Sequence, residues 1–132
     1  MKTLFLLASL SLPAFALDDA IQTFARILRN DTFEGINELG EECVVDVFGN
    51  TSDTLVELES FGITRFRLLR AAPFSADLAT RTFSSSLVTS LGDTQTEVTL
   101  STRPEGGRLR VAIQRVRRAN GQQWTSVQEC RI

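Results

Sequence analysis

The C-terminal stretch Arg108–Ile132, RLRVAIQRVRRANGQQWTSVQECRI, is the part of the chain that says most about its fold. Two segments of alternating apolar and polar residues flank Asn120-Gly121. Asn-Gly between such segments indicates a β-hairpin, because a type I′ turn needs positive φ at both central residues. The turn predicts four facing pairs on one side of the ribbon: Arg117 with Trp124, Ile113 with Gln128, Val111 with Cys130 and Leu109 with Ile132.

The chain before this hairpin continues the β pattern. Thr80–Leu91 and Thr94–Thr102 alternate around Gly92-Asp93, which predicts a second hairpin. Strands over 80–91, 94–103, 108–118 and 123–131 then form an antiparallel meander. Two further strands are predicted upstream, over Cys43–Phe48 and Ile63–Leu69, because both runs are rich in β-branched or alternating apolar residues.

The N-terminal part favours helices. A first helix over 18–29 is predicted from Ile21, Phe24, Ala25 and Leu28, which fall on one helical stripe. A second, short helix over 31–40 is predicted from the capping-box spacing of Asp31 and Glu34 and from the stripe Phe33, Ile36, Leu39. The segment 54–61 fits either a strand, by its alternation, or a helix, by its capping-box spacing, and the helix is preferred.

The first 16 residues have the pattern of a secretory signal peptide. Lys2 precedes the apolar run Leu4–Leu12, and Ala14-Phe15-Ala16 provides a small-x-small cleavage site. The apolar run is too short for a membrane anchor. We therefore expect a secreted or periplasmic protein that begins at Leu17, with residues 17–132 as a single domain.

The charge of the expected mature chain is uneven. Residues 17–60 carry 2 arginines against 11 acids, a net −9, and residues 61–132 carry 11 arginines against 5 acids, a net +6. The overall balance is acidic, which argues against a nucleic-acid partner. The two halves are expected to lie together and offset each other's charge.

Cys43 and Cys130 are the only cysteines. In an exported chain, an even pair of cysteines is most simply one disulfide, and here it closes a loop of nearly the whole domain.

The order of predicted elements resembles the nuclear-transport-factor-2-like superfamily, also called SnoaL-like or cystatin-like α+β cones. The resemblance rests on Ala20-x-x-x-Phe24-Ala25-x-x-Leu28, on Phe33-x-x-Ile36-x-x-Leu39 before Val44-Val45, and on Gly121-x-x-Trp124 before the last strand. It implies an α+β fold with N-terminal helices packed on a curved antiparallel sheet. It also implies a conical pocket, but the catalytic residues of the family's isomerases and dehydratases have no counterpart here.

Residue types exclude most catalytic devices. The chain has no His and no Tyr, and its only Lys is in the leader. With both cysteines bridged, no thiolate nucleophile, metal site or cofactor is predicted. Asp46 is the one candidate catalytic base, if it lies between Val44 and Phe48 on a buried face. The preferred alternative places Asp46 in solvent and Val45 and Val47 inside.

The binding candidates are weaker patterns. Arg115, Arg117 and Trp124 are candidate ligand or partner contacts, with Arg117 and Trp124 expected to form a cation–π pair. Five arginines lie on the penultimate strand and fit either a docking surface or a solvated face: Arg108, Arg110, Arg115, Arg117 and Arg118. In a eukaryotic secretory pathway Asn30 and Asn50 are glycosylation sequons.

We therefore expect a small exported, non-enzymatic domain that binds a partner protein or a small apolar ligand, with a homodimer through the sheet face as one form. The alternatives are a carboxylate-based pocket enzyme of the isomerase or dehydratase kind, and a secreted inhibitor or immunity-type protein.

Overall fold

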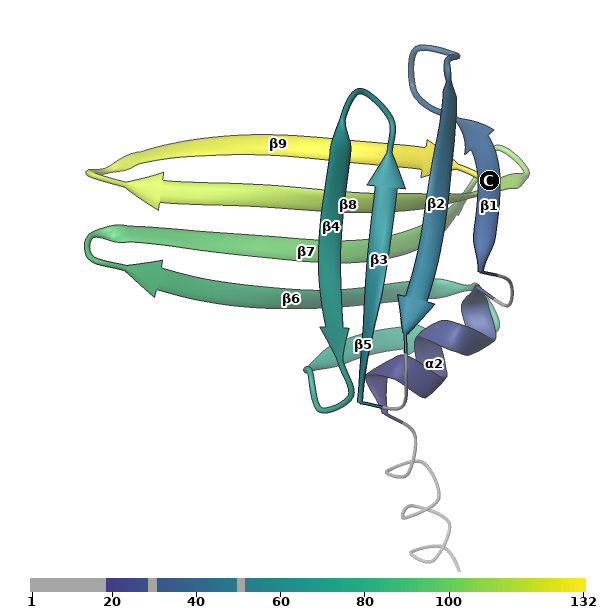
Figure 1. Ribbon diagram of the computed structural model, residues 1–132, viewed down its shortest axis with the longest axis horizontal. Helices are drawn as coiled ribbons and strands as arrows, with labels where there is room; N and C mark the ends of the chain where they lie inside the picture. The colour runs from purple at the N-terminus through teal and green to yellow at the C-terminus, as the bar shows by residue number, and fades with distance from the viewer. Residues whose placement is uncertain (1–18, 29–30, 50–51) are drawn as a thin grey trace, which may run out of the picture.

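The computed structural model describes residues 19–28, 31–49 and 52–132. Helix α2 (Ala20–Ile27) is followed by nine strands that form one antiparallel sheet in the order β4-β3-β2-β1-β9-β8-β7-β6-β5 (Figure 1). The strands are β1 Thr32–Ile36, β2 Glu42–Gly49, β3 Asp53–Glu59, β4 Ile63–Leu69, β5 Phe74–Asp77, β6 Thr82–Leu91, β7 Thr94–Glu105, β8 Arg108–Ala119 and β9 Gln122–Arg131.

This architecture overturns the α+β cone and the resemblance to the nuclear-transport-factor-2-like superfamily. The described residues contain one helix of eight residues, and all their other regular elements are strands. The predicted helix over 31–40 is strand β1 followed by a turn, and the predicted helix over 54–61 is strand β3. In β3 the side chains of Thr54, Val56 and Leu58 are buried in strict alternation. Pairing with strands on both sides outweighs the local capping-box spacing.

Helix α2 is held at its start by Asp19. The carboxylate of Asp19 accepts a hydrogen bond of 2.8 Å from the backbone N–H of Gln22, and it lies 3.2 Å from the guanidinium of Arg70. The N-cap thereby satisfies a free N–H of the first turn and ties the helix to the residue after β4. The predicted apolar stripe is largely correct, because Phe24 and Leu28 are buried and Ile21 packs against the core, but Ala25 is exposed. The buried face also includes Ala20, Thr23 and Ile27.

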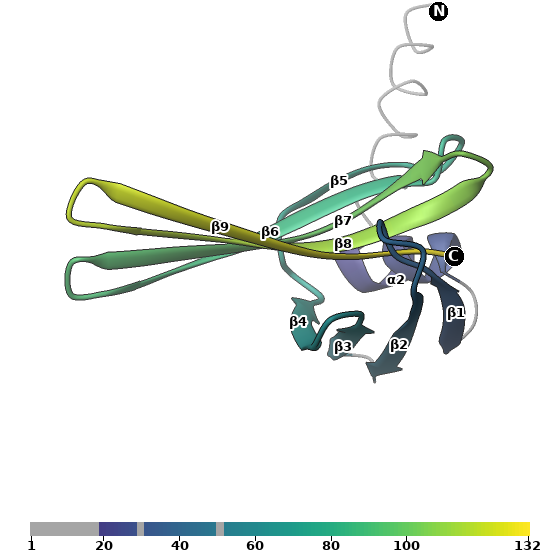
Figure 2. The ribbon, with the colours of Figure 1, turned by 90° about the horizontal axis from the view of Figure 1, so that it is seen from above.

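The sheet consists of two parts that cross each other. Strand β1 pairs with β9 only at Ile36 and Arg131. We call β1–β4 the N-terminal sheet and β5–β9 the C-terminal sheet. Figures 1 and 2 show the N-terminal sheet lying across one end of the C-terminal sheet, with strands running nearly perpendicular. The arrangement resembles orthogonal sheet packing, in which the apolar core fills the space between two layers.

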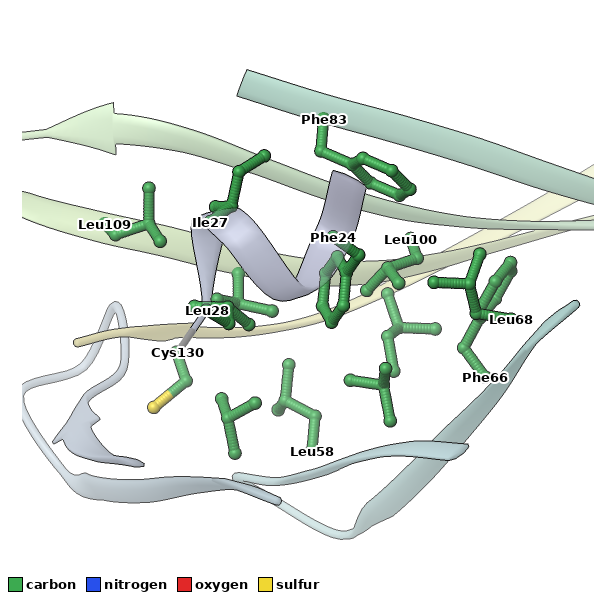
Figure 3. Packing of buried hydrophobic residues seen from close by; sticks show 14 of the residues in the cluster. Phe24, Ile27, Leu28, Leu58, Phe66, Leu68, Phe83, Leu100, Leu109 and Cys130 are labelled. Carbon is green, nitrogen blue, oxygen red and sulfur yellow. The ribbon is translucent and has the colours of Figure 1, made fainter. Parts of the chain in front are cut away.

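The core lies between the two sheets and is closed on one side by helix α2 (Figure 3). Phe24 of the helix contacts Phe83 of β6 edge to face, with ring centroids 5.2 Å apart. Opposite them, Leu58, Phe66 and Leu68 of the N-terminal sheet are at most 2% exposed. Burying one such side chain stabilises the fold by about 1.5–3 kcal/mol, so this cluster is the main source of stability.

A disulfide between Cys43 of β2 and Cys130 of β9 joins the two sheets, with the Cα atoms 5.7 Å apart. The predicted pairing of the two cysteines is therefore confirmed. The bond lies at the edge of the core, where both cysteines are almost fully buried. A disulfide of this kind is consistent with an oxidising compartment.

The predicted C-terminal meander is confirmed. Arg117 faces Trp124, Val111 faces Cys130 and Ile113 faces Gln128 in the observed register. Asn120 and Gly121 have φ of 53° and 74°, the left-handed values that the turn requires. Strand β5 lies in a segment for which no strand was predicted.

The segment predicted to be a signal peptide, 1–16, and the predicted sequon residues Asn30 and Asn50 lie outside the described residues. In the part of the chain that the structure describes, no helix is long and apolar enough to cross a membrane.

Candidate partner-binding surface

The distal halves of β6, β7, β8 and β9 extend beyond the core, and we call residues 86–99 and 114–127 the arm. Figures 1 and 2 show the arm running past the N-terminal sheet and ending in two turns. Burial changes along each outer strand of the arm. Residues 88–91 of β6 and 122–127 of β9 are all exposed, whereas Phe83, Ser85, Glu129 and Cys130 are buried.

One side of the C-terminal sheet faces the core and continues along the arm, and we call its distal part the arm face. In β8 this side begins with the buried side chains of Leu109, Val111 and Ile113. It then continues with Arg115 and Arg117, both exposed. The change from aliphatic residues to arginine on one side of one strand marks the place where the N-terminal sheet stops covering the C-terminal sheet.

Trp124 lies beside these arginines on β9. The guanidinium carbon of Arg117 is 5.3 Å from the centroid of the Trp124 ring, so the predicted cation–π pair is formed. The side chain of Trp124 is still 48% exposed. Arg117 therefore covers only part of the ring, and a large aromatic surface stays open to solvent.

The arginines of the arm face differ from most other arginines of the protein because they form no ion pair with a carboxylate of the described residues. Seven arginines in the described residues are within 4.0 Å of a carboxylate: Arg65, Arg67, Arg70, Arg103, Arg110, Arg118 and Arg131. Arg115 and Arg117 form no ion pair with any residue in the part of the chain that the structure describes. The arm face thus presents two positive charges that the rest of the described chain does not offset.

The predicted group of five arginines on β8 is divided by the strand. Alternation places Arg115 and Arg117 on the arm face, and Arg108, Arg110 and Arg118 on the opposite, outer side. Arg110 is largely buried and bonded to Glu129, and Arg118 contacts Glu97 of β7 at 3.4 Å. The sequence pattern therefore combined two surfaces that do not meet.

Apolar side chains are exposed on both sides of the arm. Leu91, at the end of β6 on the arm face, is 86% exposed. Val88 and Val127 are exposed on the outer side at 55% and 41%. Leu87 and Val98 face each other on the arm face and are partly buried against the core. Exposed apolar groups that adjoin a core mark an interaction surface more often than isolated ones do.

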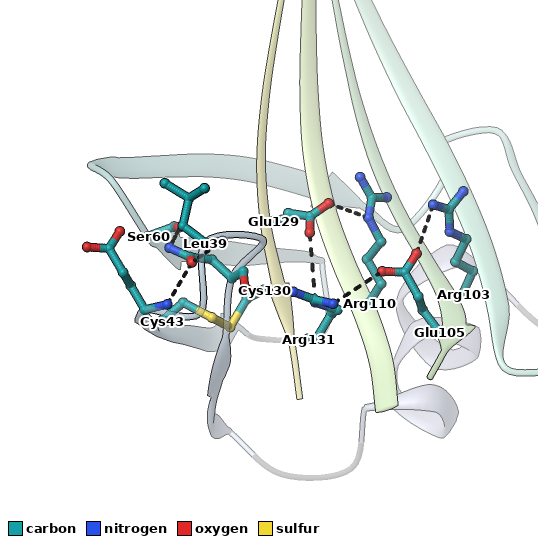
Figure 4. A network of polar contacts seen from close by, with 11 residues as sticks. Leu39, Cys43, Ser60, Arg103, Glu105, Arg110, Glu129, Cys130 and Arg131 are labelled. Atoms are coloured by element: carbon teal, nitrogen blue, oxygen red, sulfur yellow. Dashed lines mark hydrogen bonds and ion pairs between the residues drawn. A yellow bond between two sulfur atoms is a disulfide. The ribbon is translucent and has the colours of Figure 1, made fainter. Parts of the chain in front are cut away.

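A hollow of about 450 Å³ lies on the outer side of the C-terminal sheet, near the core end. Its lining includes hydroxyls from Ser75, Ser84 and Ser101 and the side chains of Arg103 and Arg110. Both arginines are held by acids: Arg103 contacts Glu105 at 3.1 Å, and Arg110 bonds to Glu129 (Figure 4). This network ties the ends of β7, β8 and β9 together, so its charges are largely used within the protein.

A second hollow lies beside the disulfide and is lined by Glu34, Gly35, Ile36, Gly40, Glu42, Cys43, Val44 and Arg108. Asp46 lines neither hollow. It is on the outer side of the N-terminal sheet, facing Thr32 and Glu57, while Val45 is fully buried on the other side. Among the described residues, no group of three or more His, Cys, Asp or Glu side chains is arranged to hold a metal ion.

Asn37 is an important polar residue that the sequence analysis missed. Its side-chain oxygen accepts hydrogen bonds from the backbone N–H groups of Leu39 and Glu41, each 3.0 Å long. Its amide nitrogen donates to the hydroxyl of Ser60, and its backbone oxygen accepts from Arg131 at 2.7 Å. Asn37 thus joins the β1–β2 turn, the β3–β4 turn and β9. The sequence signal for this turn is Asn37-x-x-Gly40, which lies within the segment 31–40 that the apolar stripe predicts to be helical.

Comparisons with protein-family models, characterised proteins and solved structures found no match to this chain.

Proposed function

We propose that the protein is an exported, non-enzymatic binding domain that holds an acidic segment of a partner protein on its arm face. The observation that carries the proposal is the exposed group formed by Arg115, Arg117 and Trp124, on the side of the sheet that is buried elsewhere. Trp and Arg are the residue types that most often dominate the energy of protein interfaces.

The unpaired charges favour an acidic partner. Arg115 and Arg117 lie in neighbouring rows of the arm face, on the same strand and side. Guanidinium groups without a carboxylate nearby are available for bidentate bonds to Asp, Glu or a chain carboxylate. The open part of the Trp124 ring offers apolar contact beside them, and Leu91, two strands away on β6, adds an exposed apolar side chain on the same side of the arm. A segment with alternating acidic and apolar side chains matches this chemistry.

The other hypotheses have less support. A small apolar ligand needs a mainly apolar cavity, whereas charged side chains line both hollows described above. These are Asp77, Arg103 and Arg110 in the first hollow, and Glu34, Glu42 and Arg108 in the second. A carboxylate enzyme would need Asp46 in a cavity, and Asp46 lies on the outer side of the N-terminal sheet. A secreted inhibitor would use the same arm face and is one form of the proposed binding domain.

The test uses the disulfide-bonded mature protein, immobilised and exposed to proteins exported by its source. Each captured protein is identified, purified and titrated against the domain by calorimetry. Trp124→Ala should weaken binding on the order of 30-fold, because truncating a tryptophan at the centre of an interface costs roughly 2 kcal/mol. The double variant Arg115→Ser/Arg117→Ser should weaken binding about tenfold or more, and mostly at low salt.

Two features of the chain provide controls. Arg108→Ser removes an arginine from the same strand but from the outer side and the other end, and it should leave the affinity unchanged. Trp124 is the only tryptophan, so its quenching by acrylamide reports on the arm alone. A partner whose affinity is the same for all these variants, and which leaves Trp124 open to acrylamide, would refute the arm face as the binding surface.

A further inference from the structure

The two long edges of the arm are open. Strand β5 pairs with β6 only at residues 82–85, so the edge of β6 from 86 to 91 has no neighbour among the described strands. Strand β1 pairs with β9 only at Arg131, so the edge of β9 from 122 to 128 is not paired with any described strand either. An unpaired edge presents a row of free N–H and C=O groups, which is a template for adding a strand from another chain.

These edges lack the protection that the molecule has elsewhere. The segments Ser86–Leu91 and Gln122–Gln128 contain no charged residue and no proline. All charges within the paired strands of the arm are on the inner strands, at Glu97 of β7 and on β8. The terminal strands of the whole sheet differ, because β4 carries Arg65 and Arg67 and β5 follows Pro73 and ends at Asp77. Charge and proline are the usual means of preventing edge pairing.

We propose that the open edge of β9 pairs in antiparallel orientation with β9 of a second copy of this chain. The product is a two-fold dimer in which the two arms form one continuous sheet. This inference concerns the edge of the arm and goes beyond the proposed function, which concerns its face.

Charge complementarity identifies a second copy as the occupant. In an antiparallel β9 pair, the tip of each arm lies beside the core end of the other copy's β9. That end is flanked by two turns: Asn37 accepts a bond from Arg131, and the backbone N–H of Phe61 donates to Gln128 at 3.3 Å. The first turn and its surroundings carry Glu38, Glu41 and Glu42. The tip carries Arg117, which forms no ion pair among the described residues, and Arg118, which contacts Glu97 of its own arm. Opposite charges therefore meet at both ends of the pair.

Apolar contacts favour the same arrangement. Leu39 and Phe61, one in each flanking turn, are 70% and 62% exposed. They lie near the place where the partner's arm tip would end. Pairing of β9 with β6 of another copy would instead be a head-to-tail contact that repeats and gives filaments. In the two-fold pair the β9 edge of each copy binds the β9 edge of the other, so no further copy can add and assembly stops at the dimer.

The experiment measures the mass of the disulfide-bonded mature protein in solution by sedimentation velocity and light scattering over a range of micromolar concentrations. The expected result is a concentration-dependent dimer. Thr125→Lys places a charge at the middle of the β9 edge and should lower the association constant at least tenfold. Thr89→Lys, the same change on the open edge of β6, should leave it unchanged. Glu38→Lys/Glu41→Lys should weaken the dimer and reduce its dependence on salt.

Far-UV circular dichroism and thermal melting of each variant establish that it is folded. Hydrogen exchange on the unmodified protein gives a measurement that needs no variant, because dimerisation should slow the exchange of amides in 122–128 as concentration rises. A monomer at all concentrations, filaments, or a dimer lost in Thr89→Lys but kept in Thr125→Lys would each overturn the inference. Since Arg115→Ser leaves both the β9 edge and the tip residues Arg117 and Arg118 intact, weaker partner binding in that single variant with the dimer retained separates the two proposals.

Discussion

Gly35 lies next to the place where β1 meets β9. A Cβ atom added there would overlap the backbone oxygen of Arg131 and lie 3.0 Å from Cγ2 of Ile132. The residue has to be glycine because the neighbour is backbone, which cannot rotate out of the way. The only β1–β9 pair, Ile36 with Arg131, is the next residue along. One absent side chain thus allows the two sheets to join.

At the residue scale, Gly35→Ala is expected to lower the free energy of unfolding by about 1–3 kcal/mol, the usual cost of inserting atoms into a packed site. Urea denaturation followed by circular dichroism measures the change. Gly62→Ala is the matched control, because a Cβ at Gly62 meets nothing within 4 Å, and it should change stability little. Equal stability of the Gly35→Ala variant and the unmodified protein would mean that β1 and β9 are not in contact there.

Among the elements, the arm contrasts with the core strands in what its side chains do. Phe66 is 2% exposed and packs between the sheets, whereas Trp124 is 48% exposed although it is the larger side chain. Large residues that contribute little to stability are available for binding. Burial of the exposed arm residues then stabilises a complex with another surface and contributes little to folding.

At the element scale, Trp124→Ala should therefore cost less than about 1 kcal/mol of folding stability. Phe66→Ala should cost about 3–5 kcal/mol, since it leaves a cavity in a packed core. Both are measured by urea denaturation with far-UV circular dichroism, at protein concentrations below those that give dimers. A loss for Trp124→Ala as large as that for Phe66→Ala would show that the arm is part of the core and would remove the basis for a binding face.

Across the whole molecule, the Cys43–Cys130 bond connects two sheets that share one bridge pair of residues. It links positions 87 residues apart in the chain. A loop of this length restricts the unfolded chain strongly, which in the loop-entropy account stabilises the folded state. The disulfide and helix α2 thus hold the two sheets together.

At this scale, Cys43→Ser and Cys130→Ser should each lower the free energy of unfolding by roughly 2–5 kcal/mol. The double variant should be no less stable than either single variant, because all three lack the same bond. Urea denaturation of oxidised protein checks both statements, with reductant added to the unmodified protein as a parallel sample. Free thiols in the oxidised protein, or additive losses in the double variant, would contradict the structure.

The sequence alone determined the local β structure of strands β6 to β9. Asn120-Gly121 sets the register of β8 and β9, and that register places Arg117 against Trp124 and Cys130 beside the core. The cysteine pairing also followed, because only two cysteines were available. The register depends only on residues within one hairpin, and the disulfide pairing depends only on the number of cysteines, so both can be predicted from the sequence.

Only the tertiary structure decided the rest. Segments 31–40 and 54–61 have helical spacing, and they are strands because β2 lies between them and pairs with both. The split of the β8 arginines between a paired outer side and an open arm face, and the exposure of Trp124, depend on where the N-terminal sheet ends above the C-terminal one. That boundary is set by the meeting of β1 and β9 at Gly35 and by the disulfide. These contacts join residues about 90 positions apart, and local periodicity carries no information about them.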